Sequence, residues 1–246
     1  MGEQIITNKD RLKFYNEAEY NYNWDKKIKS KLGIYNFFYP LSILVCNYKF
    51  DIEYHGAENI PESGSFMIAC NHVAGLDPIC LTYIARKEHR SRTWYFMAKE
   101  EFFHVFYTKL PLLLFGGFPV KRGTPDRKSL DFSIRILKEG NGLLVFPEGT
   151  RNKERTRPDP ATAKGGVALV AREAKCDVLP VSIHIEPRKE KYNGKGGKPK
   201  YIVRFGEVIP YAGLGMGEKP KSKELKAATN LIMEKICELW DKDVIE

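Results

Sequence analysis

The stretch that decides the fold lies at residues 66–78 and reads FMIACNHVAGLDP. Its first five residues form a short apolar run, which is typical of a buried β-strand. A loop containing Gly75 follows, and a helix is predicted from Pro78 to about residue 87, because proline is favoured at the first helical position. A buried strand that turns through a loop into a helix is a building unit of α/β proteins.

The same alternation continues along the chain. Thr124, Pro125 and Asp126 predict the N-cap, first residue and acidic first turn of a helix that ends at Gly140. Further strands are expected at 94–98, 143–146, 178–185 and 201–208, further helices at 165–175 and from 222 onward, and a solvated turn at 188–200. Strands that alternate with helices predict an α/β fold, with a mixed, largely parallel sheet flanked by helices.

Composition narrows the class of protein. The chain has 246 residues, 43% of them hydrophobic and 29% charged, which suits a globular protein rather than a disordered or multi-span membrane protein. Its five cysteines form no CxxC pair, so a disulfide scaffold or zinc ribbon is not expected and a reducing compartment fits best. The net charge of +9 favours anionic partners such as nucleic acid, acidic lipids or a phosphorylated substrate.

The N-terminal part differs from the rest of the chain. Residues 32–48 carry no charge and follow four lysines and a cluster of aromatic residues. As a helix this run would be about 25 Å long, short of the roughly 30 Å hydrocarbon core, and Pro40 would kink it. We therefore expect residues 1–49 to form a helical element lying on an anionic membrane, and residues 50–246 to form the α/β domain. The alternative is an amphipathic arm packed on that domain.

His72 and Asp77 follow the strand at 66–70 and are the first candidates for chemistry. Ligands of open α/β sheets bind at the carboxyl ends of strands, and a carboxylate on one imidazole nitrogen leaves the other as a general base. Two alternatives stay open. Asp77 before Pro78 also fits a helix N-cap, and Cys70 could be proposed as a nucleophile although an apolar strand cysteine is usually part of the core.

A second group of candidates follows the strand at 143–146, where the chain reads PEGTR at 147–151. Arg151 suits a phosphate because its guanidinium bonds two oxygens at once, and Glu148 would orient that group or form a surface ion pair. Glycines at 116 and 117, which permit close backbone approach, precede the basic residue Arg122. Lys99 and Lys164 are further cations, and together with the His72 and Asp77 pair these residues predict a site for a phosphate-bearing substrate that must lose a proton.

These motifs carry a resemblance. Residues 71–78 (NHVAGLDP), 99–101 (KEE), 116–122 (GGFPVKR), 146–151 (FPEGTR) and 179–181 (LPV) occur in the order of the signature blocks of the glycerolipid acyltransferases. The chain resembles most the bacterial 1-acyl-sn-glycerol-3-phosphate acyltransferases, over about residues 50–210. The third block departs from the family's usual Gly-x-x-Phe-Ile-x-Arg, and Lys121 beside Arg122 leaves open which of the two faces the phosphate.

The resemblance implies transfer of a fatty acyl group from acyl-CoA or acyl-carrier protein to the sn-2 hydroxyl of lysophosphatidic acid, giving phosphatidic acid. His72 would deprotonate the hydroxyl and Asp77 would hold the imidazole. The substrate-binding residues would be Arg122 and Arg151, with Lys99 and Lys164 as second-rank phosphate ligands, and Glu148, Gly149 and Thr150 in the acceptor pocket. No metal or cofactor would be needed beyond the thioester donor.

The sequence also leads to expectations about cellular location, partners and alternative functions. By resemblance, the N-terminal element would hold the protein on the cytoplasmic face of the cell membrane, as a peripheral or monotopic protein bound to anionic lipids. Nucleic acid is not expected as a partner, because the chain lacks a basic and aromatic binding platform. The alternatives are transfer to glycerol 3-phosphate or another lyso-lipid, or a non-catalytic membrane-binding module. Residues 110–120 are candidates for an acyl-chain groove, although core packing explains them equally well.

Overall fold

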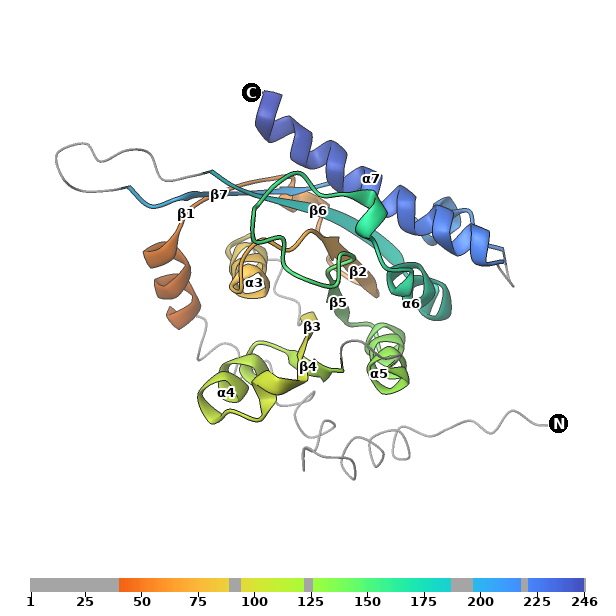
Figure 1. Ribbon diagram of the computed structural model, residues 1–246, viewed down its shortest axis with the longest axis horizontal. Coiled ribbons are helices and arrows are strands. Elements are labelled where there is room, and N and C mark those ends of the chain that lie inside the picture. Colours follow the sequence, from red (N-terminus) through yellow and green to blue (C-terminus); the bar gives the residue numbers. More distant parts are fainter. Residues whose placement is uncertain (1–39, 89–93, 122–125, 187–196, 218–220, 246) are drawn as a thin grey trace.

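The structure is a computed structural model that describes residues 40–88, 94–121, 126–186, 197–217 and 221–245. Its strands are β1 Asp51–His55, β2 Phe66–Cys70, β3 Trp94–Lys99, β4 Gly117–Val120, β5 Gly142–Val145, β6 Asp177–Ile185 and β7 Lys200–Phe205. In this part of the chain they form one seven-stranded sheet with the order β1-β7-β6-β2-β5-β3-β4 (Figure 1). The pair β6 and β7 is antiparallel and the other pairs are parallel. The predicted mixed, largely parallel sheet is confirmed.

Helices cover both faces of the sheet. They are a helix at residues 40–49, α3 Asp77–Lys87, α4 Phe106–Leu114, α5 Arg127–Lys138, α6 Gly166–Ala174 and α7 Ser222–Ile245, with short 3₁₀ turns at Ala57–Asn59, Glu100–Phe103, Pro160–Thr162 and Tyr211–Leu214. Tyr201 and Arg204 on β7 point to opposite faces because side chains alternate along a strand. Tyr201 contacts Phe50 and Asp77, whereas Arg204 contacts Asp243 of α7. Accordingly, α7 and α3 lie on opposite sides of the sheet (Figure 1).

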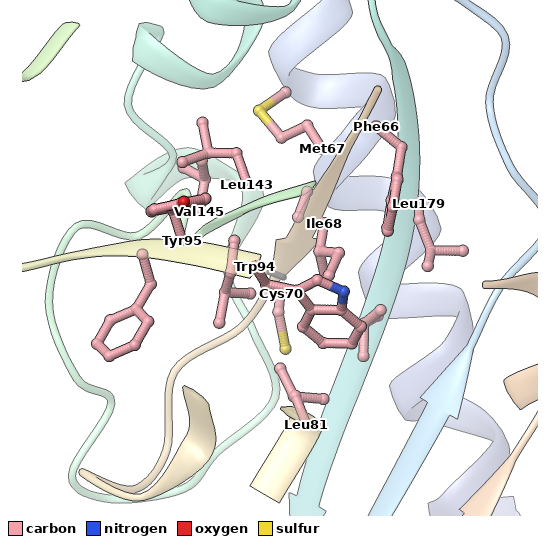
Figure 2. Close-up of a cluster of buried hydrophobic side chains, with 14 of the residues drawn as sticks. Phe66, Met67, Ile68, Cys70, Leu81, Trp94, Tyr95, Leu143, Val145 and Leu179 are labelled. Carbon is pink, nitrogen blue, oxygen red and sulfur yellow. The ribbon is translucent and has the colours of Figure 1, made fainter. Parts of the chain in front are cut away.

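The central strand β2 is completely buried between β5 and β6. Figure 2 shows side chains from several elements gathered around it, with Phe66 edge-on to Trp94 at 6.4 Å between ring centroids. The labelled neighbours are Leu81 of α3, Trp94 and Tyr95 of β3, Leu143 and Val145 of β5, and Leu179 of β6. Close packing on both faces makes the end of β2 a rigid starting point for the loop that follows.

The start of α5 corrects one prediction. The N-cap is Asp126, whose Oδ1 accepts a hydrogen bond from Ser129 N, and the helix begins at Arg127. Asp126 Oδ2 also accepts from Lys121 N at 2.9 Å, which ties the helix start to the end of β4. The predicted cap Thr124, with Pro125, lies outside the described residues. Aspartate is at least as good an N-cap residue as threonine, so the helix begins two residues later than predicted.

Three elements had no counterpart among the predictions: β1, α4 and the edge strand β4. The strand β4 contains Pro119, which is tolerated at a sheet edge because no further strand needs its missing N–H. A Cβ on Gly117 would lie 2.9 Å from the Leu112 carbonyl oxygen, so this glycine permits close packing of α4 rather than the approach of a ligand. Two predictions shift as well: β7 ends at Phe205 rather than at residue 208, and most of the predicted turn at 188–200 lies outside the described residues.

Candidate active site

Two loops leave the same edge of the sheet side by side. Strands β2 and β5 are parallel neighbours with Ala69 in register with Val145, so the segments after Cys70 and after Val145 begin next to each other. The side chain of Asn71 extends the ladder between β2 and β6: its Nδ2 donates to Ile183 O at 2.8 Å and its Oδ1 accepts from Ile183 N at 2.7 Å. The first loop is therefore anchored to the sheet directly before His72.

His72 and Asp77 are in direct contact. Asp77 Oδ2 lies 2.7 Å from His72 Nδ1 and also accepts from the N–H groups of Val73 and Ala74, at 2.8 and 2.9 Å. The ring of His72 stacks on Phe146, with centroids 4.0 Å apart, and its side chain keeps 14% of its surface exposed. With Nδ1 directed at the carboxylate, Nε2 is the nitrogen left to act on a ligand, and no hydrogen bond to it occurs within the described part of the chain.

The structure does not support the two alternatives, Asp77 as a helix N-cap and Cys70 as a nucleophile. The N-cap of α3 is Leu76 rather than Asp77, and the Asp77 carboxylate bonds back to the loop instead of to the helix N–H groups. Cys70 is fully buried, and burial together with the charges of Asp77 and Glu148 raises the pKa of its thiol well above the usual range. Since the thiolate is the reactive form, this cysteine is a poor nucleophile.

The loop after β5 holds the backbone of His72 from both sides. Glu148 Oε2 accepts a hydrogen bond from His72 N at 3.0 Å, and Asn152 N donates to His72 O at 2.8 Å. Glu148 is buried, so its interpretation as a surface ion pair is wrong. Burial raises the pKa of the Glu148 carboxyl, and the bond from the His72 amide partly offsets that rise. The second loop thus fixes the position from which the imidazole extends.

Tyr201 completes the surroundings of Asp77 and was not among the sequence candidates. Its hydroxyl donates to Asp77 Oδ1 at 2.7 Å, and the residue is fully buried on β7. The tyrosine ring lies against Phe50, with centroids 4.8 Å apart. The two partners are 124 residues apart in the chain, so no local sequence pattern links them.

A cavity of about 460 Å³ opens beside His72. This volume lies within the roughly 300–1,000 Å³ typical of small-molecule sites. Its wall is mainly apolar and comes from β3, β5, α5 and α6, with Met97, Leu130, Leu144 and Val167 among the lining residues. Lys121, Arg127 and Lys164 add positive charge, and Asp126 adds one carboxylate. The imidazole therefore meets a pocket suited to a ligand with an apolar part and an anionic group.

Two of the predicted binding residues line this cavity, and a third lies near the loop that carries His72. Gly149 and Lys164 both line it, and a Cβ on Gly149 would lie 2.8 Å from Lys164 Nζ. Gly149 also has a φ of +68°, so a larger residue would strain the turn and displace the lysine. Arg151 is exposed and lies against the first loop, because a Cβ on Gly75 would be 3.4 Å from Arg151 Nη1.

The remaining predicted residues have different placements. Lys99 pairs with Glu101 at 2.8 Å, and Thr150 is exposed to solvent. Arg122 lies outside the described residues, whereas its neighbour Lys121 lines the cavity. The predicted groove at 110–120 contributes Val120 to the lining, while Leu113, Phe115 and Phe118 of that segment are buried in the core. In the described ranges, His, Cys, Asp and Glu side chains form no group of three that could hold a metal ion.

Comparisons with known proteins bear on the family of the chain. Residues 51–184 match the family model described as Acyltransferase. The chain is 30% identical over 193 residues to 1-acyl-sn-glycerol-3-phosphate acyltransferase of Bacillus subtilis (strain 168), covering 78% of this chain and 89% of that protein. It is 27% identical over 165 residues to the enzyme of the same name from Streptococcus pneumoniae, covering 65% of this chain and 58% of that protein.

A solved structure shares the fold. The crystal structure of the 1-acyl-sn-glycerophosphate (LPA) acyltransferase PlsC from Thermotoga maritima superposes with a TM-score of 0.61 at 21% sequence identity. The match covers 89% of this chain and 83% of that one. At this level of identity the likeness supports the architecture, an α/β sheet flanked by helices.

Proposed function

The chain belongs to the acyltransferase family, and we propose that it transfers a fatty acyl group from an acyl thioester to the sn-2 hydroxyl of 1-acyl-sn-glycerol-3-phosphate, giving phosphatidic acid. The observation that carries the proposal is the His72–Asp77 pair at the wall of an apolar cavity that also presents lysines. The names of the similar proteins from Bacillus subtilis and Streptococcus pneumoniae support the choice of acceptor. The donor would be acyl-CoA or acyl-carrier protein, without a further cofactor or metal.

The proposed chemistry uses one imidazole. His72 Nε2 accepts the proton of the acceptor hydroxyl while its oxygen attacks the thioester carbonyl carbon, and Asp77 stabilises the imidazolium through Nδ1–H. The tetrahedral intermediate then expels the thiolate, the carbonyl re-forms, and the imidazolium gives the proton to sulfur. The products are the ester and a free thiol, and His72 returns to its neutral form.

Cations beside the pair would hold the acceptor phosphate. Lys121 and Lys164 line the same cavity as His72, and Arg151 lies against the loop that carries it. A guanidinium bonds two phosphate oxygens at once, whereas an ammonium acts as a point charge. Lys99 pairs with Glu101 at 2.8 Å, away from the cavity lining, whereas Lys121, 3.8 Å from Glu100, lies on that lining. Arg122 remains a predicted phosphate ligand, adjacent to Lys121.

The apolar wall of the cavity would receive an acyl chain. Burying a methylene group contributes roughly 0.8 kcal/mol, so a long chain gains binding energy along such a wall without a specific polar contact. Ser129 and Ser133 of α5 also line the cavity, and Ser133 Oγ donates to the Ser129 carbonyl oxygen. Because that hydroxyl is satisfied within its own helix, it imposes little cost on an apolar ligand.

The helix at residues 40–49 supports peripheral membrane association. Leu41, Leu44 and Tyr48 are 50%, 67% and 74% exposed, and their spacing places them on one face. The other face is anchored to the protein body: Cys46 is fully buried and its Sγ lies 3.4 Å from that of Cys80. None of the described helices is long and apolar enough to cross a membrane. We expect this exposed face, with the basic segment before it, to lie on an anionic leaflet.

A vesicle-binding measurement tests the membrane proposal. Changing Leu41, Leu44 and Tyr48 together to serine should lower co-sedimentation with anionic phospholipid vesicles severalfold, because the apolar contact area is lost. Circular dichroism serves as the control that the variant is folded. Equal co-sedimentation of the variant and the wild type would contradict this role of the helix.

An assay of thiol release tests the proposed reaction. Palmitoyl-CoA and palmitoyl-carrier protein are each supplied with lysophosphatidic acid, with glycerol 3-phosphate or without acceptor, and phosphatidic acid is identified by mass spectrometry. Release that requires lysophosphatidic acid and is lost in His72→Ala is the expected result, and it identifies the donor. If thiol release required glycerol 3-phosphate instead, the acceptor would be glycerol 3-phosphate rather than lysophosphatidic acid. Absence of thiol release with every combination of donor and acceptor would contradict the proposed function.

A further inference from the structure

We propose that Tyr201 is a positioning residue of the catalytic pair, because its hydroxyl holds Asp77 in the orientation and charge state that His72 requires. This inference rests on the proposed function and extends it to a residue on a distant strand. The two residues meet only because the fold brings β7 beneath the loop that follows β2.

The two oxygens of Asp77 have different partners. Oδ2 accepts three hydrogen bonds, from His72 Nδ1, Val73 N and Ala74 N, all within its own loop. Oδ1 accepts a hydrogen bond from the Tyr201 hydroxyl at 2.7 Å, and no other donor to this oxygen occurs within the described residues. The donors to Oδ2 come from the loop and the donor to Oδ1 comes from β7, so the bond from Tyr201 is a second, independent restraint on the plane of the carboxylate. That plane determines the direction of the bond to His72 Nδ1.

The same bond affects the charge of the pair. Asp77 is fully buried, and among the described residues its oxygens accept from the His72 ring, two backbone N–H groups and the Tyr201 hydroxyl. Burial, followed by the charge of Asp77, raises the pKa of the Tyr201 hydroxyl well above its usual range, so the tyrosine stays a neutral donor. Removing this donor would concentrate negative charge on Oδ2, and the neighbouring imidazolium would become more stable.

Other titratable or charged groups face the pair from the surrounding elements. They are Cys70 at the end of β2, Cys80 on α3, Glu148 and Arg151 in the loop after β5, and Lys121, Asp126, Arg127 and Lys164 at the cavity. A variant that tests the tyrosine must leave all of these in place. Tyr201→Phe does so, because it keeps the ring against Phe50 and removes the hydroxyl alone.

The first measurement compares steady-state kinetics of Tyr201→Phe with the wild type. We expect kcat to fall roughly tenfold, the size of effect that one hydrogen bond can give, with little change in the KM for the acceptor. We also expect the acid limb of the kcat profile to move to higher pH by roughly one unit, because a more stable imidazolium must lose its proton before it can act as a base.

Val203→Ala is the matched control for a merely structural effect. Val203 is buried on the same strand and the same face as Tyr201, two residues away. Its truncation should lower the melting temperature at least as much as Tyr201→Phe while leaving kcat and the acid limb unchanged. If Val203→Ala reproduced the kinetic changes, or if Tyr201→Phe left the acid limb in place, the proposal would be overturned.

The second measurement does not depend on activity. Histidine labelled with ¹³C and ¹⁵N is followed by NMR as pH is varied, and the His72 signals are assigned from their loss in His72→Gln. The titration midpoint of His72 should be higher in Tyr201→Phe than in the wild type. An unchanged midpoint would overturn the proposal whatever the kinetics show. Absence of acyl transfer by the wild type would contradict the proposed function, and the titration would still decide the role of Tyr201.

Discussion

The loops that follow β2 and β5 leave the same edge of the sheet, but their polar groups are used differently. In the first loop, both oxygens of Asp77 are occupied by protein donors and the His72 ring is held at Nδ1 and stacked on Phe146. In the second loop, Arg151, Lys153 and Arg155 are exposed, with no ion pair in the described residues. The comparison teaches that the His72–Asp77 pair is held in place by the protein alone, whereas the exposed cations of the second loop remain accessible to a ligand.

The largest expected effects test the first loop. His72→Ala should lower kcat by up to roughly 10⁴, the upper range for loss of a general base. Asp77→Asn should approach the same loss, because the amide would favour the wrong imidazole tautomer. Thiol-release assays on purified, folded variants measure both. Near-normal kcat in His72→Ala would show that the assembled pair is not the catalytic group and would remove the contrast between the loops.

Intermediate effects are expected from the second loop. Arg151→Ala should raise the KM for the phosphorylated acceptor by about 10- to 100-fold, consistent with loss of a charge-assisted contact, with a smaller change in kcat. Lys153→Ala is the matched control, since Lys153 is an exposed cation two residues away in the same loop. Equal KM values for Arg151→Ala and the wild type would refute the assignment of Arg151. A comparable rise in Lys153→Ala would indicate a diffuse electrostatic effect rather than a binding site.

The smallest effect concerns Glu148, whose buried carboxylate in the second loop accepts a hydrogen bond from the backbone of His72 in the first. Burial raises its pKa above the ordinary value of 4.5, so the folded protein holds this proton more tightly than the unfolded chain. The free energy of unfolding therefore falls as pH rises from the ordinary pKa of the carboxyl through its raised pKa in the folded protein. Glu148→Gln keeps an oxygen for the His72 amide but does not titrate. The difference in melting temperature between this variant and the wild type should therefore shift in favour of the variant by roughly 1–3 °C from acidic to neutral pH.

Thermal melts from pH 4 to 7.5 measure this difference. Glu154→Gln is the control, because Glu154 is an exposed carboxylate in the same loop and its environment changes little on folding. If the difference in melting temperature between Glu148→Gln and the wild type stayed constant with pH, protonation of the buried carboxyl would not be coupled to folding.

Much of the fold was predictable because its central strands carry strong local signals. The runs at β2, β5 and β6 are buried throughout or nearly so, and each is followed or preceded by clear turn residues. The strands β1 and β4 lie at the two edges of the sheet, where a short or mixed sequence is tolerated and leaves little pattern. The same reason explains why residues 110–120 were not recognised as a helix followed by an edge strand.

The site divides in the same way. His72 and Asp77 were predictable because they are five residues apart in one loop, and a strand-to-loop motif places them together. Tyr201 was not, since a tyrosine in an apolar strand is indistinguishable from an ordinary core residue until the register of β7 is known. The structural role of Glu148 was also missed, because its partner is the backbone N–H of His72, which every residue except proline possesses.

The side chain of Asn71 has a consequence for local opening. It exchanges two hydrogen bonds with the backbone of Ile183 and so makes the first residue of the loop part of the β2–β6 ladder. Loops normally exchange their amide hydrogens through small local fluctuations. The N–H groups of Val73 and Ala74 donate to a buried carboxylate directly after this anchor. They should instead exchange with solvent as slowly as the N–H groups of the central strands. The loop that carries His72 would then be among the last parts of the protein to open.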